Sequence, residues 1–139
     1  MIALDTNILV RVVTGDDLKQ VALATAVMTT SRVWVSKTVL LETAWVLELA
    51  YELSRDVVLD ALGRIVGFEN LVVEDMPAVV RALGWAGAGM GFADALHLAS
   101  SAAASEFVTF DRDLVKKATA ADAAPTVRGL APPTRATKK

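Results

Sequence analysis

The sequence predicts an α/β fold, a three-layer sandwich with a mostly parallel sheet of about five strands. Short apolar segments rich in β-branched residues alternate along the chain with longer segments that have helical periodicity. Alternating units of this kind give a parallel sheet with helices on both faces. The 139 residues, of which 54% are hydrophobic, suit one domain with a substantial core.

The first half of the chain opens on Ile2-Ala3-Leu4, which is short and uniformly apolar and therefore indicates a buried central strand. Val33-Trp34-Val35 is β-branched and aromatic, which favours a second strand. The predicted elements of this half are a strand at 2–4, helices at 8–13 and 16–28, a strand at 33–35 and a long helix at 38–53.

In the second half, Ser54 with Asp56 in the first turn predicts the N-cap of a helix. The glycines between 84 and 91 do not fit a dinucleotide-binding pattern and predict a flexible loop before Asp94. The predicted elements are helices at 57–66, 76–83 and 94–104, strands at 71–73 and 107–110, a helix opened by Asp113, and a weak edge strand at 126–128. We expect residues 1–130 to form one domain and residues 131–139 a flexible basic tail.

Four carboxylates lie where such a fold builds a site: Asp5, Glu42, Asp94 and Asp111. Asp5 and Asp111 follow the first and fourth predicted strands, whereas Glu42 and Asp94 lie early in helices. An acid near a helix start is favoured by the helix dipole in any protein, so each alone carries little information. Together they predict an acidic centre at the carboxyl ends of the strands.

These residues occur in four motifs that resemble, in order and spacing, those of the PIN-domain ribonucleases, and among them the VapC-type toxins of toxin–antitoxin pairs. The motifs are Leu4-Asp5-Thr6-Asn7, Leu40-Leu41-Glu42-Thr43, Phe92-Ala93-Asp94-Ala95-Leu96 and Val108-Thr109-Phe110-Asp111-Arg112-Asp113. The resemblance implies a PIN-like fold and endonucleolytic cleavage of RNA that depends on Mg²⁺ or Mn²⁺. It also implies a cognate antitoxin protein and a homodimer.

Under this resemblance Asp5 and Asp94 are the principal metal ligands, Glu42 is a ligand or orients metal-bound water, and Asp111 completes the cluster. Asp113 competes for that fourth place, and its alternative role is to favour the dipole at a helix start. Thr6, Asn7 and Thr109 either donate hydrogen bonds around the site or merely cap turns.

Composition agrees with a hard cation held by oxygen. The chain has no cysteine and one histidine, which excludes disulfides and the usual zinc centres. The net charge of −2 argues against bulk electrostatic coating of nucleic acid, although the sequence after residue 111 is locally basic. The chain opens directly on a predicted strand and has no long apolar stretch, so we expect a cytoplasmic protein with no membrane span.

Several other side chains have ordinary explanations. We expect His97 to be packed in apolar surroundings rather than to act as a base. The aromatic residues Trp34, Trp45, Trp85 and Tyr51 are expected in the core or a dimer interface rather than as platforms for bases. Val46, Leu49 and Tyr51 are candidate partner contacts, and core positions would explain them equally.

Three alternatives remain. A housekeeping RNA-processing nuclease would use the same chemistry. A receiver-type signalling domain has a similar alternating fold, but it would need an acidic pair after the first strand, where Asp5 stands alone. A non-catalytic PIN binding module would leave the retention of all four acids unexplained.

Overall fold

The computed structural model describes residues 1–131 of the chain. Its strands are β1 (Ile2–Ala3), β2 (Val33–Val35), β3 (Leu71–Val73), β4 (Glu106–Thr109) and β5 (Thr126–Gly129). Its helices are α1 (Thr6–Thr14), α2 (Leu18–Thr30), α3 (Lys37–Leu49), α4 (Arg55–Val66), α5 (Met76–Gly87), α6 (Phe92–Ala99) and α7 (Arg112–Ala120). The predicted alternation of strands and helices is confirmed, and the predicted tail falls almost entirely outside the described residues.

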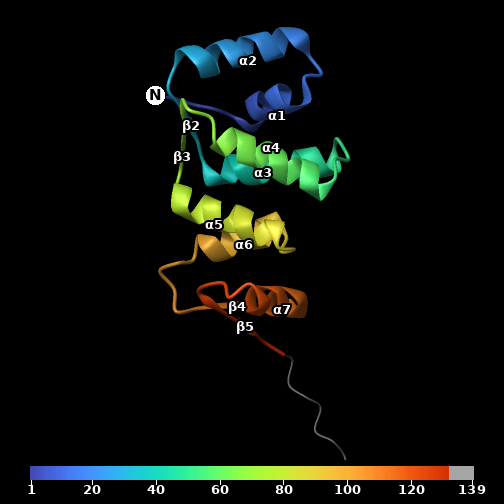
Figure 1. Ribbon diagram of the computed structural model, residues 1–139, viewed down its shortest axis with the longest axis vertical. Coiled ribbons are helices and arrows are strands. Elements are labelled where there is room, and N and C mark those ends of the chain that lie inside the picture. Colours follow the sequence, from blue (N-terminus) through green and yellow to red (C-terminus); the bar gives the residue numbers. More distant parts are fainter. Residues whose placement is uncertain (132–139) are drawn as a thin grey trace, which may run out of the picture.

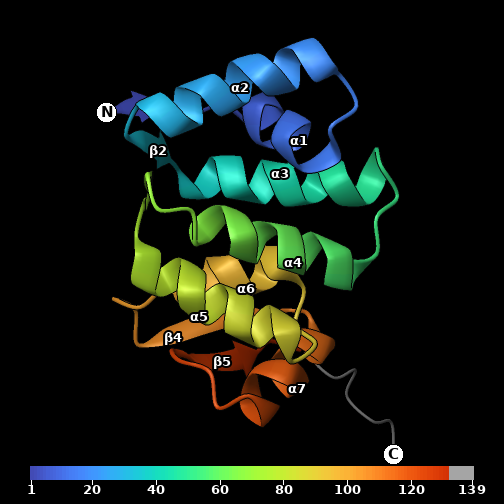
Figure 2. The same ribbon diagram turned by 45° about the horizontal axis from the view of Figure 1, so that its top comes forward.

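The strands are parallel, as predicted, but they form two sheets rather than one. β1, β2 and β3 pair in that order, with Val33 opposite Ile2 on one side and Leu71 on the other. β4 and β5 pair only with each other among the described residues, with Phe107 opposite Val127. In Figures 1 and 2 the β4–β5 pair lies at the opposite end of the molecule from β1.

The expectation that the first strand is central and buried is wrong. β1 is an edge strand of the three-stranded sheet, because it pairs only with β2 in the described part of the chain. Ile2 is 46% exposed, and only Leu4, just after the strand, enters the core. The apolar run was therefore a correct signal for a strand but not for its place in the sheet.

Several helix boundaries follow local signals. Ser36 and Ser54 cap α3 and α4 by accepting hydrogen bonds from backbone N–H groups in their first turns, and Pro77 lies in the first turn of α5. The predicted helix at 38–53 instead ends at Leu49, before a turn in which the Leu53 N–H donates to the Leu47 carbonyl.

The two helices around the glycine-rich segment also differ from prediction. α5 continues to Gly87, so that Gly84 and Gly87 are helical rather than part of a loop. α6 begins at Phe92 and ends at Ala99, five residues before the predicted end, because residues 100–105 form turns instead. Gly89, with φ of 121°, adopts a backbone conformation that favours glycine in the short connection between the helices.

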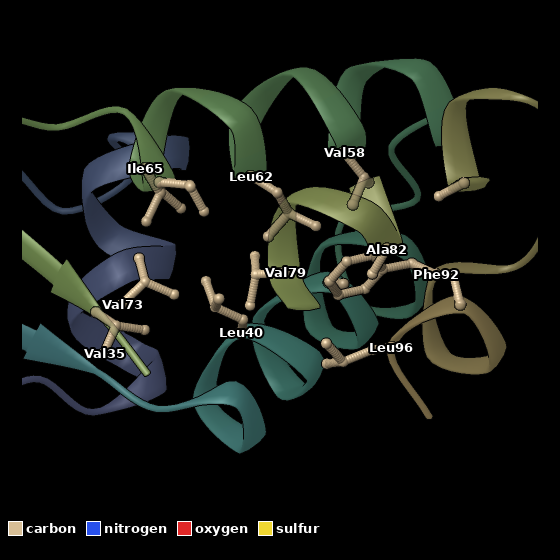
Figure 3. Packing of buried hydrophobic residues seen from close by; sticks show 14 of the residues in the cluster. Val35, Leu40, Val58, Leu62, Ile65, Val73, Val79, Ala82, Phe92 and Leu96 are labelled. Atoms are coloured by element: carbon tan, nitrogen blue, oxygen red, sulfur yellow. The ribbon is translucent and has the colours of Figure 1, made fainter. Parts of the chain in front are cut away.

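The core lies where α3, α4, α5 and α6 meet β2 and β3 (Figure 3). Leu40, Leu62 and Val79 are fully buried there, and Phe92 and Leu96 bring α6 onto the same cluster. Each such side chain stabilises the fold by about 1.5–3 kcal/mol relative to an exposed position. This packing fixes α3, which carries Glu42, and α6, which carries Asp94.

The elements follow one another along the molecule roughly in chain order (Figure 2). α1 and α2 lie at one end, α3 and α4 in the middle, and α7 with β4 and β5 at the other end. α7 packs on β4 and β5 and contributes the buried residues Leu114 and Ala118. None of the helices in residues 1–131 combines the length and hydrophobicity needed to cross a membrane.

Candidate active site

Asp5 lies in the turn between β1 and α1, where the sequence predicted a strand-end acid. It is the N-cap residue of α1, and its Oδ1 accepts a hydrogen bond from the Thr6 N–H at 2.8 Å. Leu4 is buried immediately before it, whereas the Asp5 side chain is exposed. The turn therefore anchors its backbone in the core and presents its carboxylate to solvent.

Glu42 is joined to this turn through Thr6. The Thr6 hydroxyl donates to Glu42 Oε1 at 2.5 Å, and Thr6 is only 6% exposed. Because α1 packs against α3, this contact links two elements that are distant in sequence. The expectation that Thr6 bonds within the site, rather than only capping a turn, is consistent with this contact, and Asn7 lies exposed beside it.

A hollow of about 350 Å³ contains both acids. Arg11 and Tyr51 form part of its wall, and they are held together by a hydrogen bond of 3.0 Å from Arg11 Nη1 to the Tyr51 hydroxyl. Asp16 accepts from Tyr51 at 2.7 Å and pairs with Arg11 at 3.2 Å. The Tyr51 hydrogen bond, together with Thr14 and Arg11, holds the pKa of the Asp16 carboxyl below its usual value of 3.8.

Asp94 lies in the first turn of α6, as predicted, but it borders a different hollow from Asp5 and Glu42. That hollow is also about 350 Å³ in volume, and its wall includes Trp45, Glu48 and Arg55. α3 contributes Glu42 and Val46 to the first hollow and Trp45 and Glu48 to the second. The helix thus forms a ridge between Asp5 on one flank and Asp94 on the other.

Asp111 is the N-cap residue of α7, at the end of the molecule that carries β4 and β5 (Figure 1). Its Oδ1 accepts from the N–H groups of Asp113 and Leu114 at 3.0 and 3.1 Å. Thr109 accepts from the Asp111 N–H at 3.0 Å, which is the turn-capping alternative predicted for it. Asp113 pairs with Lys117 at 2.8 Å on the surface of the same helix.

The structure thus brings Asp5 and Glu42 together in one hollow, whereas Asp94 borders another and Asp111 caps α7. Within residues 1–131, no three His, Cys, Asp or Glu side chains are grouped closely enough to hold a metal ion. The oxygen donors suit a hard cation chemically, but their placement does not fit a centre of three or four carboxylates. No catalytic step through a metal follows from this arrangement.

Two aromatic side chains that were expected in the core or a dimer interface, Trp45 and Tyr51, border these hollows. Trp45 is exposed and therefore not a core residue, whereas Trp34, Trp85 and Tyr51 are half-buried. His97 is exposed as well, so the expectation that it is packed is wrong. Arg11 and Arg55 were not singled out from the sequence, because one arginine among fourteen basic residues carries no local signal.

A larger hollow, about 570 Å³ in volume, lies elsewhere, between α1, α2 and α4. Apolar side chains such as Val12, Met28 and Phe68 dominate its wall, and its one carboxylate is Asp60. Hydrolytic chemistry on a charged substrate is better served by the two hollows that contain Asp5, Glu42 and Asp94.

Residues 2–120 match the family model of the PIN domain. The chain belongs to the PIN domain family. PIN domains are in general nucleases that use divalent metals, and their fold class agrees with the mixed α/β structure described above. The matched range includes all four predicted acids. No curated protein matches the chain.

Proposed function

We propose that this PIN protein is an endoribonuclease that hydrolyses RNA phosphodiester bonds with Mg²⁺, or alternatively Mn²⁺, and that it is the toxin of a type II toxin–antitoxin pair. The observation that carries the proposal is the PIN match over residues 2–120 together with the Asp5–Thr6–Glu42 arrangement. Carboxylates that hold a metal ion are themselves oriented by hydrogen bonds, and the contact from the buried Thr6 hydroxyl to Glu42 supports the proposal in that way.

The proposed site residues are Asp5, Glu42, Asp94 and Asp111, both as catalytic groups and as ligands that the cation would have to draw together, since no three of them are grouped within residues 1–131. Carboxylates are the side chains that Mg²⁺ prefers, and the chain offers no cysteine as a softer ligand. Arg11 borders the first hollow and can bind a phosphate of the substrate through its Nη2 donors, since within residues 1–131 its Nε donates to Gln20 and its Nη1 to Asp16 and Tyr51.

The proposal predicts that RNA cleavage needs a divalent cation and this acidic set. Cleavage should stop in a chelator and return with Mg²⁺ or Mn²⁺. Asp5→Asn and Asp94→Asn should each abolish cleavage, because each removes a negative charge while conserving the size of the side chain. Cleavage of a labelled RNA by each purified variant measures this, with thermal unfolding to show that the variants remain folded.

His97→Ala is the matched control. His97 is exposed on α6, three residues beyond Asp94, and its loss should leave most of the activity. Cleavage that persists in a chelator would contradict the metal requirement. Full activity in Asp94→Asn would show that the acid of α6 lies outside the site.

The toxin role adds two partners to the proposal. One is a cognate antitoxin protein whose C-terminal segment blocks the acidic site, and the other is a second copy of the chain in a homodimer. It also places the protein in the cytoplasm. Expression in a bacterial host should arrest growth, and Asp5→Asn should not. Arrest by both proteins would show that toxicity does not come from hydrolysis. Cleavage in vitro without arrest would favour the housekeeping RNA-processing nuclease.

A further inference from the structure

Trp45 is the exposed tryptophan of the structure. Its side chain is 66% exposed, although it lies on α3 between the fully buried residues Leu40 and Leu47. It follows Glu42 by three residues, so the two side chains lie about one turn apart on the exposed side of the helix, with Glu42 bordering the first hollow and Trp45 the second. A large aromatic side chain is thus held in solvent beside a proposed catalytic carboxylate.

The surroundings of Trp45 form a concave site. Trp45, Glu48, Arg55 and Asp94 all border the hollow of about 350 Å³ between α3, α4 and α6. Arg55 is held in place by a hydrogen bond of 3.2 Å from its Nη2 to the Ala86 carbonyl, and within residues 1–131 its other donors have no hydrogen-bond partner and can meet a ligand. The hollow therefore offers the exposed aromatic face of Trp45, one cation and hydrogen-bond acceptors.

The charges around Trp45 disfavour a second copy of the chain as its partner. Glu42 and Glu48 flank it on the same helix, and Asp94 lies across the hollow. A two-fold contact centred on this face of α3 would bring these carboxylates against their own copies, which is unfavourable. An unpaired nucleobase is neutral and flat and carries hydrogen-bond donors, so the base itself brings no charge against these carboxylates, and Arg55 is the cation of the hollow that can pair with the adjoining phosphate.

We propose that Trp45 stacks on a nucleobase of single-stranded RNA, which occupies the hollow next to Asp94 and sets where the strand lies across α3. This inference rests on the proposed function, since it assigns a contact to the same substrate. Unpaired bases stack on tryptophan with little dependence on sequence, because every base has an aromatic face. Trp45 would therefore set the register of the RNA rather than read its sequence.

The test is direct binding of an oligoadenylate of about eight nucleotides, a length within the usual range of single-strand sites. Binding is measured in a chelator and again in Ca²⁺, so that it is observed without relying on cleavage. Trp45→Ala should weaken binding by roughly ten- to one-hundred-fold, the loss expected for one base stack. Trp45→Phe retains an aromatic face and should stay much closer to the parent.

Leu49→Ala is the matched control. Leu49 is also 66% exposed and lies one turn further along α3, but it does not border the hollow. Its replacement should leave RNA binding unchanged. In a variant with Trp34→Phe and Trp85→Phe, Trp45 is the one remaining tryptophan, and the oligonucleotide should quench its fluorescence.

Equal binding by the parent and Trp45→Ala would overturn the inference, and if the parent still cleaves RNA, the proposed function would stand without it. A parent that neither binds nor cleaves RNA would overturn both. Sedimentation of each variant adds a further outcome: if Trp45→Ala converts a dimer to a monomer and leaves RNA binding intact, a second copy covers the tryptophan, and the inference is wrong.

Discussion

Two turns of this molecule have the same local design and different surroundings. In each, a strand ends at an aspartate that caps the following helix: Asp5 between β1 and α1, and Asp111 between β4 and α7. Around Asp5, the buried Thr6 reaches across to Glu42 on α3. Around Asp111, the carboxylate accepts hydrogen bonds from two backbone N–H groups of α7, and Asp113 forms an ion pair with Lys117 on the same helix.

The difference shows that a strand–acid–helix motif determines a cap but not a site. The cap depends on neighbours in sequence, so both turns acquire it. A site also depends on the elements that pack against the turn. The turn at Asp5 has α3 beside it, because α1 packs against α3. The turn at Asp111 is followed by α7, which contacts mainly β4 and β5. The following predictions test this distinction.

The largest effect is expected from Thr6→Val. This change keeps the shape of a buried side chain and removes the hydroxyl that holds Glu42. Cleavage should fall by about ten- to one-hundred-fold, as when a group that orients a catalytic ligand is lost. Initial cleavage rates measure it.

Thr109→Val is the equivalent change in the second turn. It removes an acceptor from the Asp111 N–H, so it should alter cleavage far less than Thr6→Val. Equal losses in the two variants would mean that the turns act together in one site and would remove the distinction.

The next effect concerns Asp111 and separates its two roles. Asp111→Ala removes the cap of α7 and should cost about 1 kcal/mol of unfolding free energy, whereas asparagine also caps well and should cost less. Urea denaturation measures both. If Asp111 also completes the acidic set, Asp111→Asn should lose cleavage while it keeps its stability.

Unchanged cleavage by Asp111→Asn would leave Asp111 as a cap alone. The same measurement on Asp113→Asn then tests whether Asp113, rather than Asp111, is the fourth acid of the site. Loss of cleavage there would assign the fourth place to Asp113 in spite of its ion pair with Lys117.

The smallest effect is the pH dependence of the network beside the first turn. The pKa of Asp16 lies below 3.8 in the folded protein, chiefly because the Tyr51 hydroxyl donates to it. A depressed pKa contributes stability that is present above the unfolded value and is lost as pH falls through the folded value. Asp16→Asn should therefore be less stable than the parent near neutral pH, and the two should converge in acid below pH 3.8. Urea denaturation as a function of pH measures this, and a difference that stays constant in acid would contradict it.

Much of the local structure could be predicted from the sequence. Asp5 at a strand end, Ser54 as a cap, Met76-Pro77 at a helix start and Asp94 in a first turn are all confirmed, because each depends on residues only a few positions away. The same reasoning failed at the ends of α3 and α6, where apolar periodicity continues beyond the last helical residue.

The remaining errors concern tertiary contacts. The sequence predicted one sheet, but which strands pair depends on contacts between distant segments, and β4 with β5 forms a separate pair. Trp45 and His97 are both exposed because of which face of their helices the neighbours cover, and periodicity did not identify that face. The grouping of the four acids remains a prediction for the same reason.

The chain-order arrangement of the elements has a consequence for synthesis on the ribosome. Most of the close packing is between elements that are near one another in sequence, such as α1 with α2, α3 with α4, and α5 with α6. Folds dominated by such near contacts form quickly and can assemble as the chain emerges. Asp5, Thr6 and Glu42 can meet once the first fifty residues are available, whereas Asp94 and Asp111 join the molecule late. A nascent chain that has not reached residue 111 therefore lacks part of the proposed acidic set, and a nuclease of this design would become active only after Asp111 has been synthesised.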